Sequence, residues 1–138
     1  MMAATFHLSL PCFDIKETKR FYTEDLGLNC GRETNDWLDV DLFNNQLTYV
    51  LATQFKFDYP NYTFEKDTLP SFHFGVVLDA DEWEKMHDRI NHWSSETILT
   101  KTFLKDKHGE HVSFFVKDPN GYTIEFKTFI EEDEMFMM

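Results

Sequence analysis

The chain has 138 residues, of which 42% are hydrophobic and 17% aromatic, so it is long and apolar enough to bury one compact core. Its 25 acidic and 13 basic residues give a formal net charge of -12, which argues against binding of nucleic acid, because a phosphate backbone needs clustered Lys and Arg. No apolar run approaches the roughly 20 residues that cross a bilayer, and the N-terminus lacks the basic start of a signal peptide, so we expect no membrane partner.

The only two cysteines, Cys12 and Cys30, are too few for the disulfide framework of a small secreted protein. Free thiols persist in a reducing compartment, so the sequence favours a cytoplasmic location. Both cysteines are expected to be small, half-buried side chains.

The first elements follow from alternation and capping signals. Residues 6–10 alternate between apolar and polar, which predicts a half-buried strand that Pro11 is expected to end. Asp14, with Glu17 three positions later, predicts the start of a helix, and Gly27 predicts its end. Three short strands, separated by turn signals, are then expected near residues 28–33, 37–43 and 46–52.

The second half of the chain repeats this order. A strand is predicted at 72–78, and a helix follows from Asp79 or Asp81. Three further strands are expected near residues 97–104, 111–117 and 122–129. The sequence DPNG at 118–121 predicts the turn before the last strand, because proline fixes φ and glycine suits the final position.

Each half therefore has the order β-α-β-β-β, and we predict an α+β fold in which two such modules form a half-open, metal-binding cup. Neither sheet, with a helix on its outer face, closes a core alone. We expect a single domain over residues 1–138. Its parts are a first module at 4–53, a connector at 54–70 that packs against the domain, a second module at 71–129 and a solvated or frayed acidic tail at 130–138.

Two histidines occupy matched places in the two halves. His7 and His73 each lie on the first strand, ahead of the capped helix; a single such histidine is usually structural, but a matched pair favours a shared role. In the last strand, alternation sets Glu125 apart from its apolar neighbours, where an unpartnered buried carboxylate is costly. The alternative is that this face is exposed and Glu125 pairs with a lysine. Two imidazoles and one carboxylate predict a divalent-metal site with open positions.

Four segments together resemble the glyoxalase / bleomycin-resistance / extradiol-dioxygenase (vicinal oxygen chelate) superfamily. They are HLSLP at 7–11, FYTEDLGL at 21–28, FHFG at 72–75 and DPNGYTIE at 118–125. The resemblance spans residues 5 to 129. It implies paired βαβββ modules, a metal in the cup with His7, His73 and Glu125 as its ligands, and a homodimer.

One departure from the family pattern bears on the chemistry. Glyoxalase I-like members hold the metal with a fourth ligand, a carboxylate on the last strand of the first module. The position that matches Glu125 is Thr48, and residues 42–57 contain no Asp or Glu. Gln46 as a neutral ligand is the alternative. The remaining set of two His and one Glu favours Fe(II), as in extradiol dioxygenases, with Mn, Zn or Ni also possible.

Further site residues follow from strand parity. His111 shares a face with Ser113 in the 111–117 strand and is a candidate acid or base, the alternative being a surface histidine. The residues expected to line the pocket are Ser9, Gln46, Thr48 and Tyr49, although a tyrosine in a core strand is also typical of packing. Asp39 and Asp41 are expected to face water.

The sequence thus favours a metal-dependent enzyme whose small-molecule substrate chelates the metal through two neighbouring oxygens. The reactions considered are those of an extradiol-type dioxygenase or a glyoxalase-like lyase or isomerase. The alternative is a metal-free, ligand-sequestering protein of the bleomycin-resistance kind, for which the 15 Phe, 5 Tyr and 3 Trp and the acidity suggest a cationic planar ligand. A third interpretation is a domain that keeps the fold without turnover.

Overall fold

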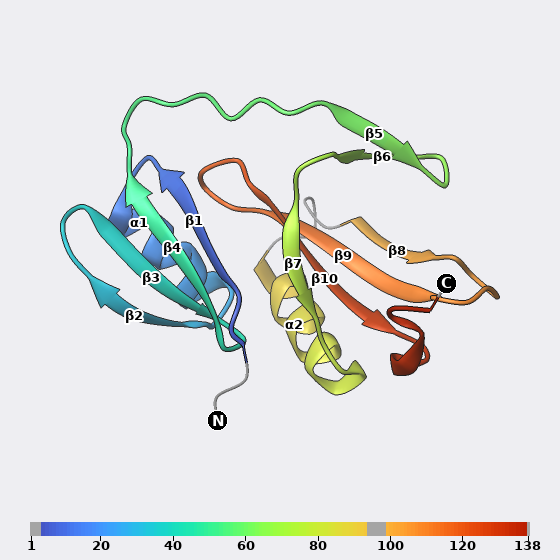
Figure 1. The fold of residues 1–138 in the computed structure, drawn as a ribbon. Coiled ribbons are helices and arrows are strands. Elements are labelled where there is room, and N and C mark those ends of the chain that lie inside the picture. Colours follow the sequence, from blue (N-terminus) through green and yellow to red (C-terminus); the bar gives the residue numbers. More distant parts are fainter. Residues whose placement is uncertain (1–3, 94–98, 138) are drawn as a thin grey trace. The chain divides into compact units, whose positions relative to one another are not determined.

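The computed structural model of the chain describes residues 4–93 and 99–137, which form two compact units, Met1–Phe57 and Asp58–Met138 (Figure 1). The first unit contains β1 (His7–Cys12), α1 (Ile15–Arg20), η1 (Phe21–Asp25), β2 (Asn29–Glu33), β3 (Trp37–Leu42) and β4 (Asn45–Leu51). The second contains β5 (Asn61–Phe64), β6 (Asp67–Pro70), β7 (Phe74–Val77), α2 (Ala80–Trp93), β8 (Leu99–Phe103), β9 (His111–Lys117), β10 (Thr123–Phe129) and η2 (Glu132–Glu134).

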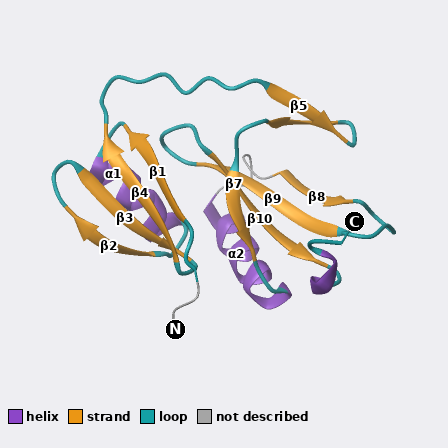
Figure 2. Ribbon diagram, in the orientation of Figure 1, coloured by secondary structure: helices purple, strands orange, loops and turns teal. Residues whose placement is uncertain are grey.

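The predicted α+β repeat is confirmed. Each unit holds a four-stranded sheet of the same topology, β1-β4-β3-β2 in the first and β7-β10-β9-β8 in the second. In both, the first strand of the module pairs in parallel with the last, and the remaining pairs are antiparallel. A helix lies against one face of each sheet (Figure 2), so the opposite face is left for polar side chains.

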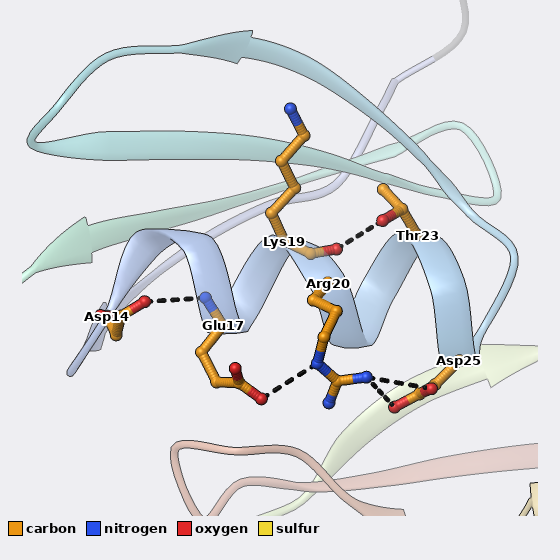
Figure 3. Close-up of polar contacts among 6 residues, drawn as sticks. All are labelled: Asp14, Glu17, Lys19, Arg20, Thr23 and Asp25. Atoms are coloured by element: carbon orange, nitrogen blue, oxygen red, sulfur yellow. Dashed lines mark hydrogen bonds and ion pairs between the residues drawn. The ribbon is translucent and has the colours of Figure 1, made fainter.

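The first helix begins where the sequence predicts (Figure 3). The Oδ1 atom of Asp14 accepts a hydrogen bond of 2.8 Å from the backbone N–H of Glu17, which satisfies one of the free donors of the first turn. The Glu17 carboxylate pairs with Nε of Arg20 at 3.0 Å. The N-cap is therefore made by Asp14.

The helix then widens into a π-helical turn, η1, which the sequence does not predict. The hydroxyl of Thr23 donates to the carbonyl of Lys19 at 2.7 Å (Figure 3), and the N–H of Leu26 reaches the carbonyl of Phe21, five residues earlier, at 3.0 Å. A threonine hydroxyl that bonds the preceding turn competes with the α-helical ladder. Gly27, with φ of +71°, ends the element as predicted.

Pro11 does not end the first strand, and that prediction is wrong. Pro11 pairs with Val50 inside the β1–β4 ladder, and β1 continues to Cys12. Proline is tolerated here because β1 is an edge strand of its sheet, so the missing N–H removes no hydrogen bond to a second neighbour.

The segment expected to be a connector contains a hairpin, β5–β6, that belongs to the second unit. Its turn residues Glu65 and Lys66 both have positive φ, +49° and +74°, as a two-residue hairpin requires. Neither residue type signals such a turn, so the hairpin could not be predicted from these two residues. The strand predicted at 97–104 appears as β8, and residues 97 and 98 lie outside the described residues.

The apolar core of each unit lies between its sheet and its helix. In the second unit, Trp83 of α2 packs edge-on against Phe114 of β9 and donates its indole N–H to the carbonyl of Phe126 at 2.9 Å. Phe114 and Phe126 are fully buried. Their alternation along the strands directs Glu125 to the sheet face opposite the helix.

The acidic tail, expected to be solvated or frayed, is largely exposed and is tied to the rest of the unit at one point. The Glu134 carboxylate accepts a hydrogen bond from the N–H of Gly109 at 3.3 Å and lies 2.6 Å from Nδ1 of His108. These contacts hold η2 against the turn before β9. They lower the pKa of Glu134, chiefly through its hydrogen bond with His108.

Candidate functional site

The second unit brings His73 and Glu125 together. His73 lies directly before β7, and Glu125 lies in the middle of β10, opposite Gly75 on one side and Phe115 on the other. The Nε2 atom of His73 is 3.2 Å from Oε1 of Glu125. Two of the three predicted metal ligands are therefore in direct contact.

Glu125 is a buried carboxylate with its partners supplied. It is 7% exposed, and its Oε2 atom accepts a hydrogen bond of 2.6 Å from the hydroxyl of Ser113 on β9. The ammonium of Lys127 lies 3.8 Å from the same oxygen. Burial alone would raise the pKa of Glu125, but the contacts with His73, Ser113 and Lys127 lower it below its usual range. The carboxyl is thus held in its ionised form.

The orientation of His73 is fixed from the side away from Glu125. Its Nδ1 atom lies 3.0 Å from the carbonyl oxygen of Pro70, the last residue of β6. Because a carbonyl only accepts, Nδ1 carries a proton, and Nε2 faces Glu125, to which it donates when the ring is doubly protonated. The hydrogen bond with Glu125 raises the pKa of His73, against the opposing effect of burial.

This pair fits a metal ion. Two ligand atoms that each lie about 2.1 Å from a metal at a right angle are about 3.0 Å apart, close to the observed separation of 3.2 Å. A metal-bound histidine usually donates its other N–H to a carbonyl or carboxylate, which is what Pro70 provides, and ligating carboxylates are themselves hydrogen-bonded, as Glu125 is by Ser113. Within either unit, the described residues add no third His, Cys, Asp or Glu to the pair.

A pocket of about 350 Å³ opens over this pair. The predicted acid or base, His111, lines the same pocket, with its Nδ1 atom 2.8 Å from the carbonyl oxygen of Gly109 and its ring against Phe103. The second unit therefore places His73, Glu125 and His111 around one cavity.

In the first unit, His7 begins β1 and is exposed. It pairs in register with Gln46, and Ser9 pairs with Thr48. His7 lies two residues before Ser9, and His73 lies two residues before Gly75, which pairs with Glu125. The ladders thus match Thr48 with Glu125, in agreement with the count from the sequence.

The expectation that Asp39 faces water is wrong. It is 7% exposed and accepts hydrogen bonds from the Thr48 hydroxyl at 2.7 Å, Nε of Arg32 at 3.0 Å and Nε2 of Gln46 at 3.3 Å. Burial opposes ionisation, but these donors lower the pKa of Asp39 below its ordinary value. Asp41 is exposed, as expected.

The carboxylate that β4 lacks is thus present on the neighbouring strand, because Asp39 pairs in register with Thr48. A hollow of about 420 Å³ lies beside it, lined in part by Gly31 and Gln46. Thr48 is half-buried through its contact with Asp39. Tyr49 points to the other face of β4, where it is completely buried and its hydroxyl contacts that of Tyr22.

Sequence reasoning missed several residues of the second-unit pocket. Lys127 shares a face with Glu125 two positions away, a signal that strand alternation contains. Tyr62, Phe64 and Leu69 come from the β5–β6 hairpin, which the sequence did not predict, so no signal placed them at the site.

Two βαβββ modules, one of them with a partly buried histidine–glutamate pair beneath a small pocket, define a protein of the paired-module α+β class. The family model described as the Glyoxalase/Bleomycin resistance protein/Dioxygenase superfamily matches residues 5–126. The chain therefore belongs to this superfamily.

Solved structures share the fold at low sequence identity. A glyoxalase/bleomycin resistance protein/dioxygenase from Alicyclobacillus acidocaldarius matches with a TM-score of 0.76 and 24% identity over 96% of each chain. An integron cassette protein from the mobile metagenome of the Halifax Harbour sewage outfall matches with a TM-score of 0.63 and 17% identity, over 92% of this chain and 99% of that one. A fosfomycin resistance protein from Listeria monocytogenes matches with a TM-score of 0.67 and 12% identity, over 99% and 100%.

No curated protein matches the chain in sequence. No helix among residues 4–93 and 99–137 is long and apolar enough to span a membrane.

Proposed function

We propose that the protein is a metal-dependent enzyme that holds one divalent metal ion with His7, His73 and Glu125. Its substrate is a small molecule that offers two neighbouring oxygens, and its reaction is that of an extradiol-type dioxygenase or of a glyoxalase-like lyase or isomerase. When bound, the metal supplies a Lewis acid that stabilises negative charge on such a substrate.

The contact between Nε2 of His73 and Oε1 of Glu125 carries this proposal. The carbonyl of Pro70 fixes the protonated Nδ1 of His73, and the hydroxyl of Ser113 fixes the carboxylate, which are the supports that ligating histidines and carboxylates usually have. The third position is assigned to His7 because His7 and His73 occupy equivalent places in the ladders of the two modules.

Fe(II) is the favoured metal, with Mn, Zn or Ni as alternatives, because two imidazoles and one carboxylate leave positions open for substrate. His111 is the proposed acid or base. With Nδ1 directed to the carbonyl of Gly109, its Nε2 atom is the ring nitrogen that remains for a ligand. We further propose a homodimer in a reducing cytoplasm, where the thiols of Cys12 and Cys30, neither of which is in a disulfide, would stay reduced.

Metal content tests the proposal directly. Protein purified without chelator and loaded anaerobically with Fe(II) is expected to hold one equivalent, and His7→Ala, His73→Ala and Glu125→Ala are each expected to lose it. His92→Ala is the matched control, because His92 is an exposed histidine of α2 whose Nδ1 atom contacts the carbonyl of Asp88. Oxygen uptake with a catechol panel then separates a dioxygenase from a lyase or isomerase.

A metal-free binding protein is the second candidate. The observation that favours it is that the Glu125 carboxylate already has His73 and Lys127 as partners without a metal. Full metal retention in His73→Ala would contradict the metal site. Tight ligand binding by protein that takes up no metal would support the binding protein instead.

A further inference from the structure

The walls of the second-unit pocket are aromatic and come from three parts of the chain. Tyr62 and Phe64 belong to the β5–β6 hairpin, Phe103 to β8 and Phe115 to β9. Phe64 lies 5.4 Å from Phe103, ring centre to ring centre, and the ring of Tyr62 is within 9° of parallel to that of His73. Flat faces of this kind favour a planar, apolar ligand body.

The hairpin is held in place over the pocket. The ammonium of Lys101, on β8, contacts the carboxylate of Asp67 and donates to the carbonyl of Glu65 at 2.6 Å. The N–H of Leu104 donates to the Glu65 carboxylate at 3.0 Å. Leu69 of β6 is 4% exposed and packs with Phe103 and Phe115. The hairpin is thus a fixed wall of the pocket.

The charged groups that face the pocket are not equally engaged. Both oxygens of Glu125 already have partners, His73 at 3.2 Å and Ser113 at 2.6 Å. Lys127, by contrast, has one contact among the described residues, an ion pair of 3.8 Å that is too long for a hydrogen bond. Its side chain is 29% exposed. Lys127 therefore offers hydrogen-bond donors to an incoming ligand, whereas both oxygens of Glu125 are already engaged by protein groups.

We propose that this pocket binds a small aromatic anion, with the ring between the aromatic walls and the acidic group on Lys127. This inference rests on the proposed function, because it takes the pocket to be the substrate site of that enzyme, and it names the class of substrate. A volume of about 350 Å³ lies near the lower end of the roughly 300–1,000 Å³ of small-molecule sites, which suits a single ring. The ammonium of Lys127 thus favours an anionic ligand. The acidity of the whole chain, with a net charge of -12, suggested a cationic ligand instead.

Binding of three ring compounds of equal size tests the inference: benzoate, benzamide and benzylamine, which are anionic, neutral and cationic. Acetate serves as an anion without a ring. Dissociation constants are measured by calorimetry or NMR titration for wild type, for Lys127→Met, which keeps the apolar stem, and for Lys127→Gln. Lys117→Met is the control, because Lys117 is an exposed lysine at the end of β9 whose loss changes the net charge equally.

Wild type and Lys117→Met are expected to bind benzoate at least about tenfold more tightly than benzamide, benzylamine or acetate, which corresponds to about 1.4 kcal/mol. In the two Lys127 variants, assayed after metal is removed with a chelator, the benzoate-to-benzamide ratio is expected to fall to within about twofold of one, because the ammonium that pairs with the carboxylate is gone. Equal binding of benzoate and benzamide by wild type, or a tenfold preference that survives both Lys127 substitutions, would overturn the inference.

Metal content measured on the same samples separates this inference from the proposed function. A benzoate preference that depends on Lys127 in protein that takes up no metal supports the aromatic-anion site and overturns the metal-dependent function. Stoichiometric metal with no benzoate preference in wild type overturns the aromatic-anion site alone.

Discussion

Replacement of Gly75 by alanine is expected to separate β7 from β10 and so to dismantle the His73–Glu125 pair. Gly75 pairs in register with Glu125, and a Cβ atom at position 75 would lie 1.6 Å from the Glu125 carbonyl oxygen. Real Cβ contacts essentially never fall below 3.0 Å, so the two strands must move apart by about 1.4 Å. Backbone N···O distances of about 2.9 Å then become too long for hydrogen bonds. The ladder has four residue pairs. At about 1 kcal/mol net for each hydrogen bond, the loss is about 3–4 kcal/mol of unfolding free energy.

Urea unfolding at 25 °C measures this loss, with Gly31→Ala as the matched control. At Gly31 a Cβ atom would lie 3.7 Å from Cβ of Asp39, an ordinary contact, so the control is expected to stay within about 1 kcal/mol of wild type. An unfolding free energy of Gly75→Ala within about 1 kcal/mol of wild type would refute the reasoning, because the close approach of the two backbones would then have no energetic consequence.

Three further predictions concern the polar contacts. Ser113→Ala leaves Oε2 of buried Glu125 without its 2.6 Å donor, so urea unfolding should show a loss of about 1–3 kcal/mol; an unchanged midpoint would contradict this. Asp39→Asn should cost about 1–3 kcal/mol near neutral pH. The folded-state pKa of Asp39 lies below its ordinary 3.8, so the stability that its charge supplies is present above pH 3.8 and is lost as the pH falls below it. The unfolding free energies of wild type and Asp39→Asn should therefore converge in acid. A difference that stays constant with pH would contradict this prediction. Lys101→Met removes the contacts with Glu65 and Asp67, so amide hydrogen exchange in β5 and β6 should accelerate while that of β3 and β4 stays the same. Hairpin amides as well protected in the variant as in wild type would argue against anchoring by Lys101.

Most of the fold could be predicted from the sequence because its signals are local. Alternation in β10, the Asp14 cap and the Gly27 stop each depend on a few neighbouring residues. The errors arise where distant residues decide. Pro11 stays in β1 because that strand lies at the edge of its sheet, and Asp39 is buried against Thr48 and Arg32, which come from other strands. Patterning along one strand cannot contain either fact.

The candidate site divides in the same way. His73 was proposed because the repeat matches it to His7, and Glu125 because of the alternation in its strand, and the two side chains are in contact. The hairpin residues Tyr62 and Phe64 were missed because the turn at Glu65 and Lys66 uses positive φ without glycine or asparagine. Reasoning from sequence therefore identified the polar centre of the pocket but not its aromatic walls.

The proposed metal site is tested most sharply by X-ray diffraction from crystals of protein loaded with Fe(II) or Mn, with data collected at the absorption edge of the metal. We expect one anomalous peak about 2.0–2.3 Å from both Nε2 of His73 and Oε1 of Glu125, with His7 as the third protein ligand. Stoichiometrically loaded protein in which the anomalous peak touches neither atom, while His73 and Glu125 remain hydrogen-bonded to each other, would contradict it.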